Sequence, residues 1–138
     1  MIDVAHQHPA RRFPRKETLR AVLAVLRKER GPRWHLSVVF TNDRYMRRIN
    51  RTFLGHNVVT DVIAFPLHDV MNIDGELYVN LDQAARQAKE EGAGVTEEVR
   101  RLLIHGTLHL LGYRDSTRTQ RDRMRKLEER YLALLRRR

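Results

Sequence analysis

The sequence of 138 residues contains no cysteine and no long apolar run. The lack of cysteine excludes disulfide bonds and thiolate metal sites, so a metal ion would have to be held by histidine, aspartate or glutamate. The longest purely apolar run, residues 21–26, is far too short to cross a bilayer. Residues 1–14 show no apolar segment of the signal-peptide type. We therefore expect a soluble, cytoplasmic protein with no membrane and no disulfide partner.

Lysine is also scarce, although the chain is strongly basic. Lysine and arginine together number 27 against 17 acidic residues, a net charge of +10, and nearly all of the basic residues are arginine. The planar guanidinium group binds phosphate through two hydrogen bonds, which favours a polyanionic partner. Arginine-rich codon usage would produce the same bias without such a partner.

The length and the hydrophobic pattern predict a single domain over residues 1–138. Helical spacing predicts helices over 16–30 and 81–91, and a third from a cap at Thr96 to Leu111. Two more helices should begin after caps at Asn42 (or the preceding threonine) and Thr117, the second in a capping box with Gln120. Their apolar faces should include Phe53 and Leu134, respectively. Short strands are expected over 34–40, 60–65 and 76–80. Because helices and strands do not alternate strictly, the pattern favours an α+β fold.

The most informative segment is 102–115, an apolar helix that carries two histidines. His105 and His109 lie four residues apart and therefore on one helix face, where they can bind one ion side by side. Gly112 can end the helix in the left-handed conformation and turn the chain back, so that Asp115 reaches the same ion. The alternative is a pair of core histidines bonded to backbone or carboxylate groups, with Asp115 merely preceding the last helix.

The spacing His-x3-His-x5-Asp has the layout of the metzincin metal helix, with aspartate at the third position. Zinc peptidases of this type need a glutamate directly after the first histidine as general base. Here that residue is Gly106, which argues against a peptidase.

The segment from His105 to Tyr113, together with 60–66 and 75–77, resembles the YbeY family. The resemblance spans about 38–135. It implies a small, mostly parallel sheet packed by helices, with the metal helix buried beside it. It also implies a zinc-dependent, single-strand-specific endoribonuclease that matures the 3′ end of 16S ribosomal RNA and serves ribosome quality control. The implied partners are single-stranded RNA, ribosomal RNA and the small ribosomal subunit.

Two positions depart from the family pattern. His105 and His109 match its first two metal ligands, whereas Asp115 stands where the third is usually histidine. Leu54 stands where many members have an arginine that would bind phosphate. The resemblance identifies no catalytic residue in this chain beyond the metal ligands.

Several arginines are candidates for RNA contacts. Arg44, Arg47, Arg48 and Arg51 should form one helix face, and Arg114 adjoins the third ligand position. Arg51 or Arg114 could replace the arginine absent at position 54. The alternative is an ordinary solvated helix face.

The remaining polar residues suggest structural roles. We expect Asp61 to bond locally at the start of a strand, the alternative being a role in the site. We expect His6, His8, His35, His56 and His68 to be surface or hydrogen-bonding residues. A competing hypothesis for the whole chain is a non-catalytic RNA-binding ribosome-assembly factor with a structural metal.

Overall fold

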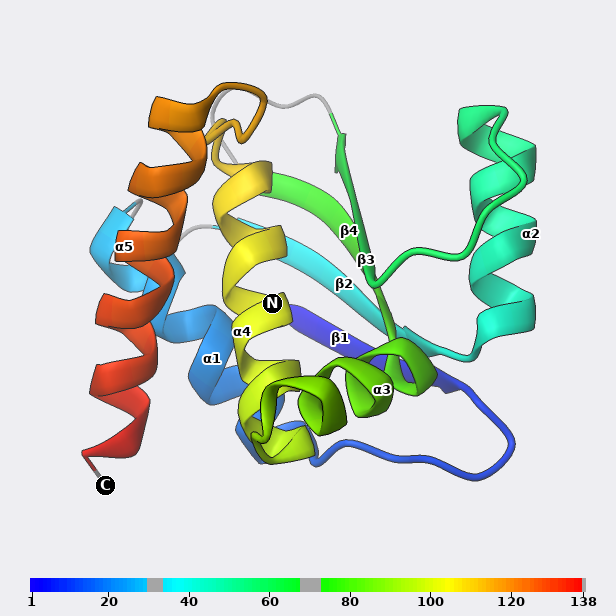
Figure 1. Ribbon diagram of the computed structural model, residues 1–138. Helices are drawn as coiled ribbons and strands as arrows, with labels where there is room; N and C mark the ends of the chain where they lie inside the picture. The colour runs from blue at the N-terminus through cyan, green and yellow to red at the C-terminus, as the bar shows by residue number, and fades with distance from the viewer. Residues whose placement is uncertain (30–33, 68–72, 138) are drawn as a thin grey trace.

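The computed structural model describes residues 1–29, 34–67 and 73–137. Its centre is a four-stranded sheet in the order β1-β2-β4-β3 (Figure 1). β1 (Ile2–Gln7), β2 (Trp34–Thr41) and β4 (Ile73–Asn80) are parallel, and β3 (Val62–Leu67) is an antiparallel edge strand. The expected α+β fold with a small, mostly parallel sheet is confirmed.

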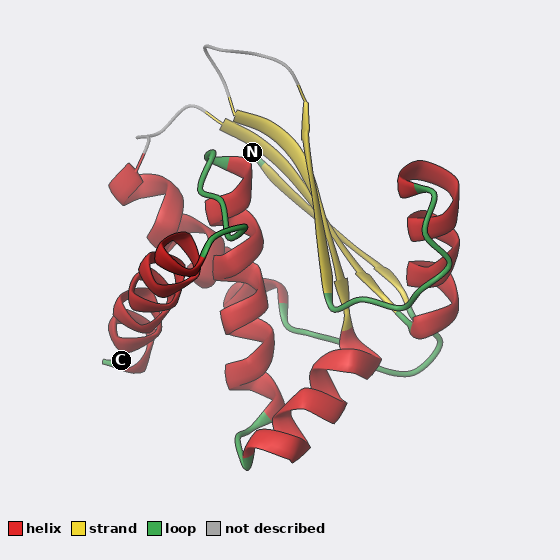
Figure 2. Ribbon diagram, turned by 45° about the horizontal axis from the view of Figure 1, so that its top comes forward, coloured by secondary structure: helices red, strands yellow, loops and turns green. Residues whose placement is uncertain are grey.

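Helices cover both faces of the sheet unequally (Figure 2). α1 (Arg15–Glu29), α3 (Leu81–Glu91), α4 (Val95–Leu110) and α5 (Arg118–Arg136) lie on one side, and α2 (Asp43–Leu54) lies alone on the other. α4 contacts β3 and β4 as well as α1, α3 and α5, so it is buried as the resemblance implied.

The unequal covering produces two apolar clusters. The larger one joins alternate residues of β2 and β4, such as Val38 and Leu77, to the inner faces of α1, α4 and α5. The smaller one lies under α2 and contains Met46, Ile49 and Ile63. Within the described part of the chain, no helix is both long enough and apolar enough to cross a membrane.

Several predicted boundaries differ from the structure. β3 begins at Val62 rather than at residue 60, and β4 begins at Ile73 rather than at residue 76. α4 begins at Val95 behind an extended Gly94, so Thr96 lies inside its first turn and does not cap it. Only residues 92–94 separate the end of α3 from the start of α4. β3 continues through Pro66, because an edge strand tolerates a residue without an N–H donor. The predicted end of the first helix at residue 30 lies outside the described residues.

Other features were missed or placed on the wrong face. Strand β1 was not predicted, because it is short and half of its residues, Asp3, His6 and Gln7, are polar. Phe53 and Leu134 follow the apolar spacing of their helices, yet both side chains are exposed near the helix ends. The prediction for His68 falls outside what the structure describes.

Candidate metal centre

The last two turns of α4 bring the two histidines together. His105 and His109 are one helical turn apart, and their Nε2 atoms are 3.0 Å from one another. The two rings meet edge to face with centroids 4.6 Å apart. Both nitrogens therefore point at the same small volume.

The end of α4 turns the chain back toward that volume. Gly112 has a φ of 98°, in the left-handed region that favours glycine. Its N–H donates to His109 O at 3.0 Å, and Tyr113 N–H donates to Leu108 O at 3.1 Å. This pair of bonds is a Schellman motif, which satisfies the last carbonyl groups of the helix.

The reversal carries Asp115 to the histidine pair. Its Oδ2 lies 3.2 Å from His109 Nε2 and 3.5 Å from His105 Nε2. A tetrahedral zinc ion with bonds of about 2.1 Å places its ligand atoms about 3.4 Å apart, so the three atoms fit such an ion. The structure thus brings the three predicted ligands together.

Glu128 on α5 contacts the ring nitrogen of His105 that does not face His109 and Asp115. Its side chain is only 7% exposed, and its Oε2 lies 2.5 Å from His105 Nδ1. With the proton on Nδ1, His105 donates to the carboxylate and turns the lone pair of Nε2 toward His109 and Asp115. A carboxylate behind a histidine is the usual second layer of a zinc site.

Further charges connect Glu128 to the interior. Arg101 Nη1 lies 3.4 Å from Glu128 Oε1, and Arg101 Nε donates to Glu98 Oε1 at 3.1 Å. Gln87 Nε2 donates to the other oxygen of Glu98 at 2.6 Å. Each buried carboxylate therefore has a cationic or amide partner, as burial of a charge requires.

The same contacts shift the pKa values of His105 and Arg101. Burial lowers the pKa of His105, but the hydrogen bond and charge of Glu128, with the charges of Asp115 and Asp61, outweigh it and raise the net pKa. Burial also lowers the pKa of Arg101, and the carboxylates of Glu98 and Glu128 raise it to a larger extent. The guanidinium group consequently stays charged.

Gly106, between the two histidines, faces the sheet. A Cβ atom at this position would lie 2.8 Å from Leu77 Cδ2 and 3.1 Å from Val62 Cγ2. A side chain at this position would require the side chains of Leu77 and Val62 to shift. Close packing against these two sheet residues therefore disfavours a peptidase general base here.

A groove of about 430 Å³ opens beside the centre, with His109 in its wall. It runs between β3, the end of α2 and the loop that joins them, and Leu54 lines it. All five candidate RNA-binding arginines are exposed, but none is among the described residues that line this groove. Arg44 and Arg48 instead line a separate groove of about 520 Å³ near His6 and His8.

The other predicted polar residues have local partners. Asp61 Oδ1 accepts from Val62 N–H at 2.7 Å, which confirms the bond at the start of the strand. His6 Nε2 accepts from Phe13 N–H at 3.1 Å, His8 lies 2.7 Å from Asp82 Oδ1, and His35 lies 3.3 Å from Asp3.

Comparison with known proteins decides the family. A family model described as Endoribonuclease YbeY matches residues 3–136. The chain belongs to the YbeY family. The match begins at residue 3, so β1, which the sequence resemblance did not cover, is part of the family fold.

Individual relatives agree with this assignment. The Endoribonuclease YbeY of Chlorobium phaeovibrioides is 41% identical over 130 residues, covering 94% of this chain and 88% of the relative. That of Salinibacter ruber is 36% identical, covering 95% and 89%. The solution structure of TM1509 from Thermotoga maritima matches with a TM-score of 0.66 and 26% identity, covering 99% of this chain and 92% of that chain.

Proposed function

We propose that this YbeY chain is a zinc-dependent endoribonuclease that cuts single-stranded RNA. Its membership of the Endoribonuclease YbeY family supports an RNA-cleaving hydrolase directly. The proposal adds zinc as the metal. It also adds maturation of the 16S ribosomal RNA 3′ end and ribosome quality control, on the small ribosomal subunit in the cytoplasm, as the role.

One observation carries the proposal: three ligand atoms converge at a place that solvent can reach. His105 Nε2, His109 Nε2 and Asp115 Oδ2 would hold the ion, and 43% of the Asp115 side chain is exposed. A structural zinc site is usually closed by four protein ligands, whereas a catalytic site has three and an open position. Among the residues described, no fourth histidine or carboxylate joins this group.

The metal and the surrounding side chains would have different roles. Zinc, when bound, would polarise a phosphoryl oxygen and lower the pKa of a bound water molecule to about 7. Glu128 fixes the tautomer and orientation of His105. Asp115 contributes a negative charge, which moderates the Lewis acidity of the ion. Exposed arginines such as Arg47, Arg51 and Arg114 attract the RNA backbone.

The test is a gel assay on single-stranded precursor ribosomal RNA with zinc-loaded protein. Wild-type protein is compared with His105→Ala and with a matched control, His35→Ala, whose exposed side chain pairs only with Asp3 among the described residues. Cleavage by the wild type and the control, but not by His105→Ala, is the expected result. Equal cleavage by all three proteins would point to a contaminating ribonuclease and would contradict the proposal.

A second candidate function is a non-catalytic assembly factor with a structural metal. It is favoured by Leu54, an apolar residue that lines the groove beside His109 in place of a phosphate-binding arginine. This alternative predicts that zinc raises the melting temperature of the wild type but not of His105→Ala, with no cleavage by either protein.

A further inference from the structure

Exposed apolar side chains gather around the groove beside His109. Phe53, Leu54 and Val58, at the end of α2 and in the loop after it, are 69%, 44% and 54% exposed. Phe53 contacts Phe65 edge to face, with ring centroids 5.9 Å apart, and still leaves most of its ring open. A cluster of exposed apolar side chains on the surface of a domain is typical of a binding site.

The groove has the size of a small-ligand site. Its volume is about 430 Å³, and its walls carry the apolar side chains of Leu54, Val58, Val62 and Ala64. His109, one of the three proposed metal ligands, stands in the same wall. A molecule in the groove therefore lies next to the metal centre.

Buried amide groups hold the exposed wall in place. Asn50, only 4% exposed, donates from Nδ2 to Val58 O at 3.1 Å. Asn80, also buried, donates from Nδ2 to Thr60 O at 3.3 Å. The loop therefore presents Val58 in a fixed position before any ligand arrives, which lowers the entropic cost of binding.

We propose that this groove binds one unpaired nucleobase of an RNA strand whose neighbouring phosphate lies at His105, His109 and Asp115. The inference rests on the proposed function and adds a subsite to it. Every base has flat apolar faces that pack on apolar or aromatic side chains whatever its identity. A base inside a duplex is covered on both faces and paired at its edge, so only an unpaired or extruded base can enter. The groove thus favours single strands.

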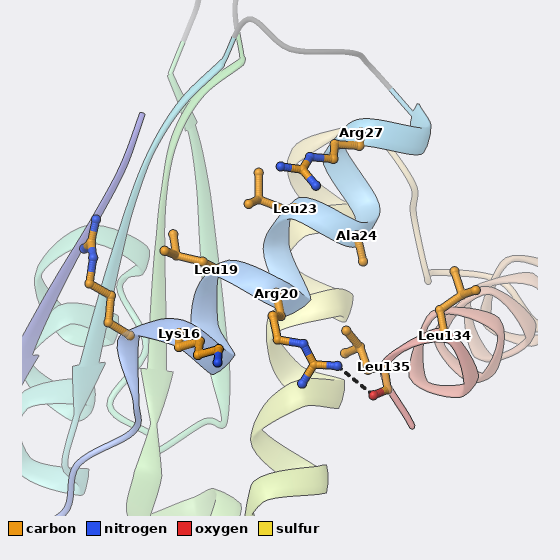
Figure 3. A pocket seen from close by; sticks show the side chains of 9 residues that line it. Lys16, Leu19, Arg20, Leu23, Ala24, Arg27, Leu134 and Leu135 are labelled. Atoms are coloured by element: carbon orange, nitrogen blue, oxygen red, sulfur yellow. Dashed lines mark hydrogen bonds between the residues drawn. The ribbon is translucent and has the colours of Figure 1, made fainter. Parts of the chain in front are cut away.

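A second apolar groove provides the control. It lies between α1, which contributes Leu19 and Leu23, and α5, which contributes Leu134. Arg20 of α1 donates to Leu135 O of α5 at 2.8 Å (Figure 3). Its lining contains none of the three proposed metal ligands. Leu134 is exposed, as Leu54 is, so Leu134→Ser removes similar apolar surface at a different place.

The experiment measures binding of short labelled RNA hexamers with 2′-O-methyl riboses to the zinc-loaded chain by fluorescence anisotropy. A series of hexamers each lacks one base at a successive position but keeps every phosphate. For wild type and Leu134→Ser, loss of the base at one position should weaken binding about fivefold or more, which corresponds to at least ~1 kcal/mol of stacking. For Leu54→Ser/Val58→Thr, the intact and abasic hexamers should bind alike.

The outcomes separate the two levels of the hypothesis. If wild type binds RNA but every abasic hexamer binds as tightly as the intact one, the nucleobase subsite is refuted and the endoribonuclease proposal stands. If Leu54→Ser/Val58→Thr keeps its base dependence, or Leu134→Ser loses it, the subsite lies elsewhere and the inference is wrong. If wild type binds no RNA, both fail together.

Discussion

Replacing Glu128 by glutamine tests whether the carboxylate behind His105 prepares the site for a metal ion. A carboxylate only accepts hydrogen bonds, so both neighbours of Glu128 must donate to it. His105 Nδ1 lies 2.5 Å from Oε2, and Arg101 Nη1 lies 3.4 Å from Oε1. Glutamine offers one acceptor oxygen and one amino group. It can satisfy His105 or Arg101, and the other donor then faces an N–H group.

The expected magnitude follows from these two contacts. Losing one charge-assisted hydrogen bond in a buried place costs about 1.5–3 kcal/mol. Arg101 keeps Glu98, so we expect the metal-free protein to lose about 2 kcal/mol, or roughly 8 °C in Tm for a chain of this length. Loss of the group behind a metal ligand weakens metal binding about 10–100-fold. Glu128→Gln should lie near tenfold, and Glu128→Leu near a hundredfold.

The assay is zinc competition against a chromophoric chelator, with thermal unfolding of the metal-free chain measured in parallel. Glu129→Gln is the matched control, since it changes the charge equally on the exposed face of the same helix. If Glu128→Gln binds zinc as tightly as Glu129→Gln does, then Glu128 does not position His105. A loss of stability alone would assign Glu128 a structural role only.

Two further predictions concern α4. Gly106→Ala should lower the free energy of unfolding by about 1–2 kcal/mol, because the cost of overpacking against Leu77 exceeds the gain in helix propensity. Urea unfolding measures this loss, and Gly94→Ala, whose added Cβ meets nothing within 4 Å, is the control. Equal midpoints would show that α4 moves without cost. Because the folded-state pKa of His105 is raised, its protonated form stabilises the metal-free chain below pH ~6.5, and that stability is lost as pH rises through the folded pKa. Urea midpoints of wild type and His105→Gln should converge at high pH, and a constant difference would refute this assignment.

Features that a few neighbouring residues decide were predictable from the sequence. The capping box of Thr117 and Gln120 forms as expected, because both bonds lie within one turn. Asn42 caps α2, and Gly112 adopts its left-handed turn, for the same reason. The exposure of Phe53 was not predictable in this way, since helical spacing alone does not show that its ring meets Phe65 of β3 at one edge and leaves the rest of its surface open.

In the candidate site too, contacts set by nearby residues were predictable, whereas a contact between two helices was not. The meeting of His105, His109 and Asp115 follows from helical periodicity and one turn, and the sequence predicted it. Glu128 was missed, because it contacts His105 only after α5 packs on α4. A signal was present: a carboxylate falls on the same helix face as Met124, where burial without a partner would be costly.

The two opposite sides of α4 explain why the chain carries this centre in this place. On the sheet side, Gly106 lets the helix backbone approach Leu77 so closely that even a Cβ atom would require the Leu77 side chain to shift. On the other side, the buried charges of Glu128 and Arg101 lock His105 from behind. An apolar interior of the same volume would serve stability at least as well as such an ion network. We therefore interpret the network as the support of a proposed metal ligand, and the close packing at Gly106 as a feature that disfavours a glutamate after the first histidine.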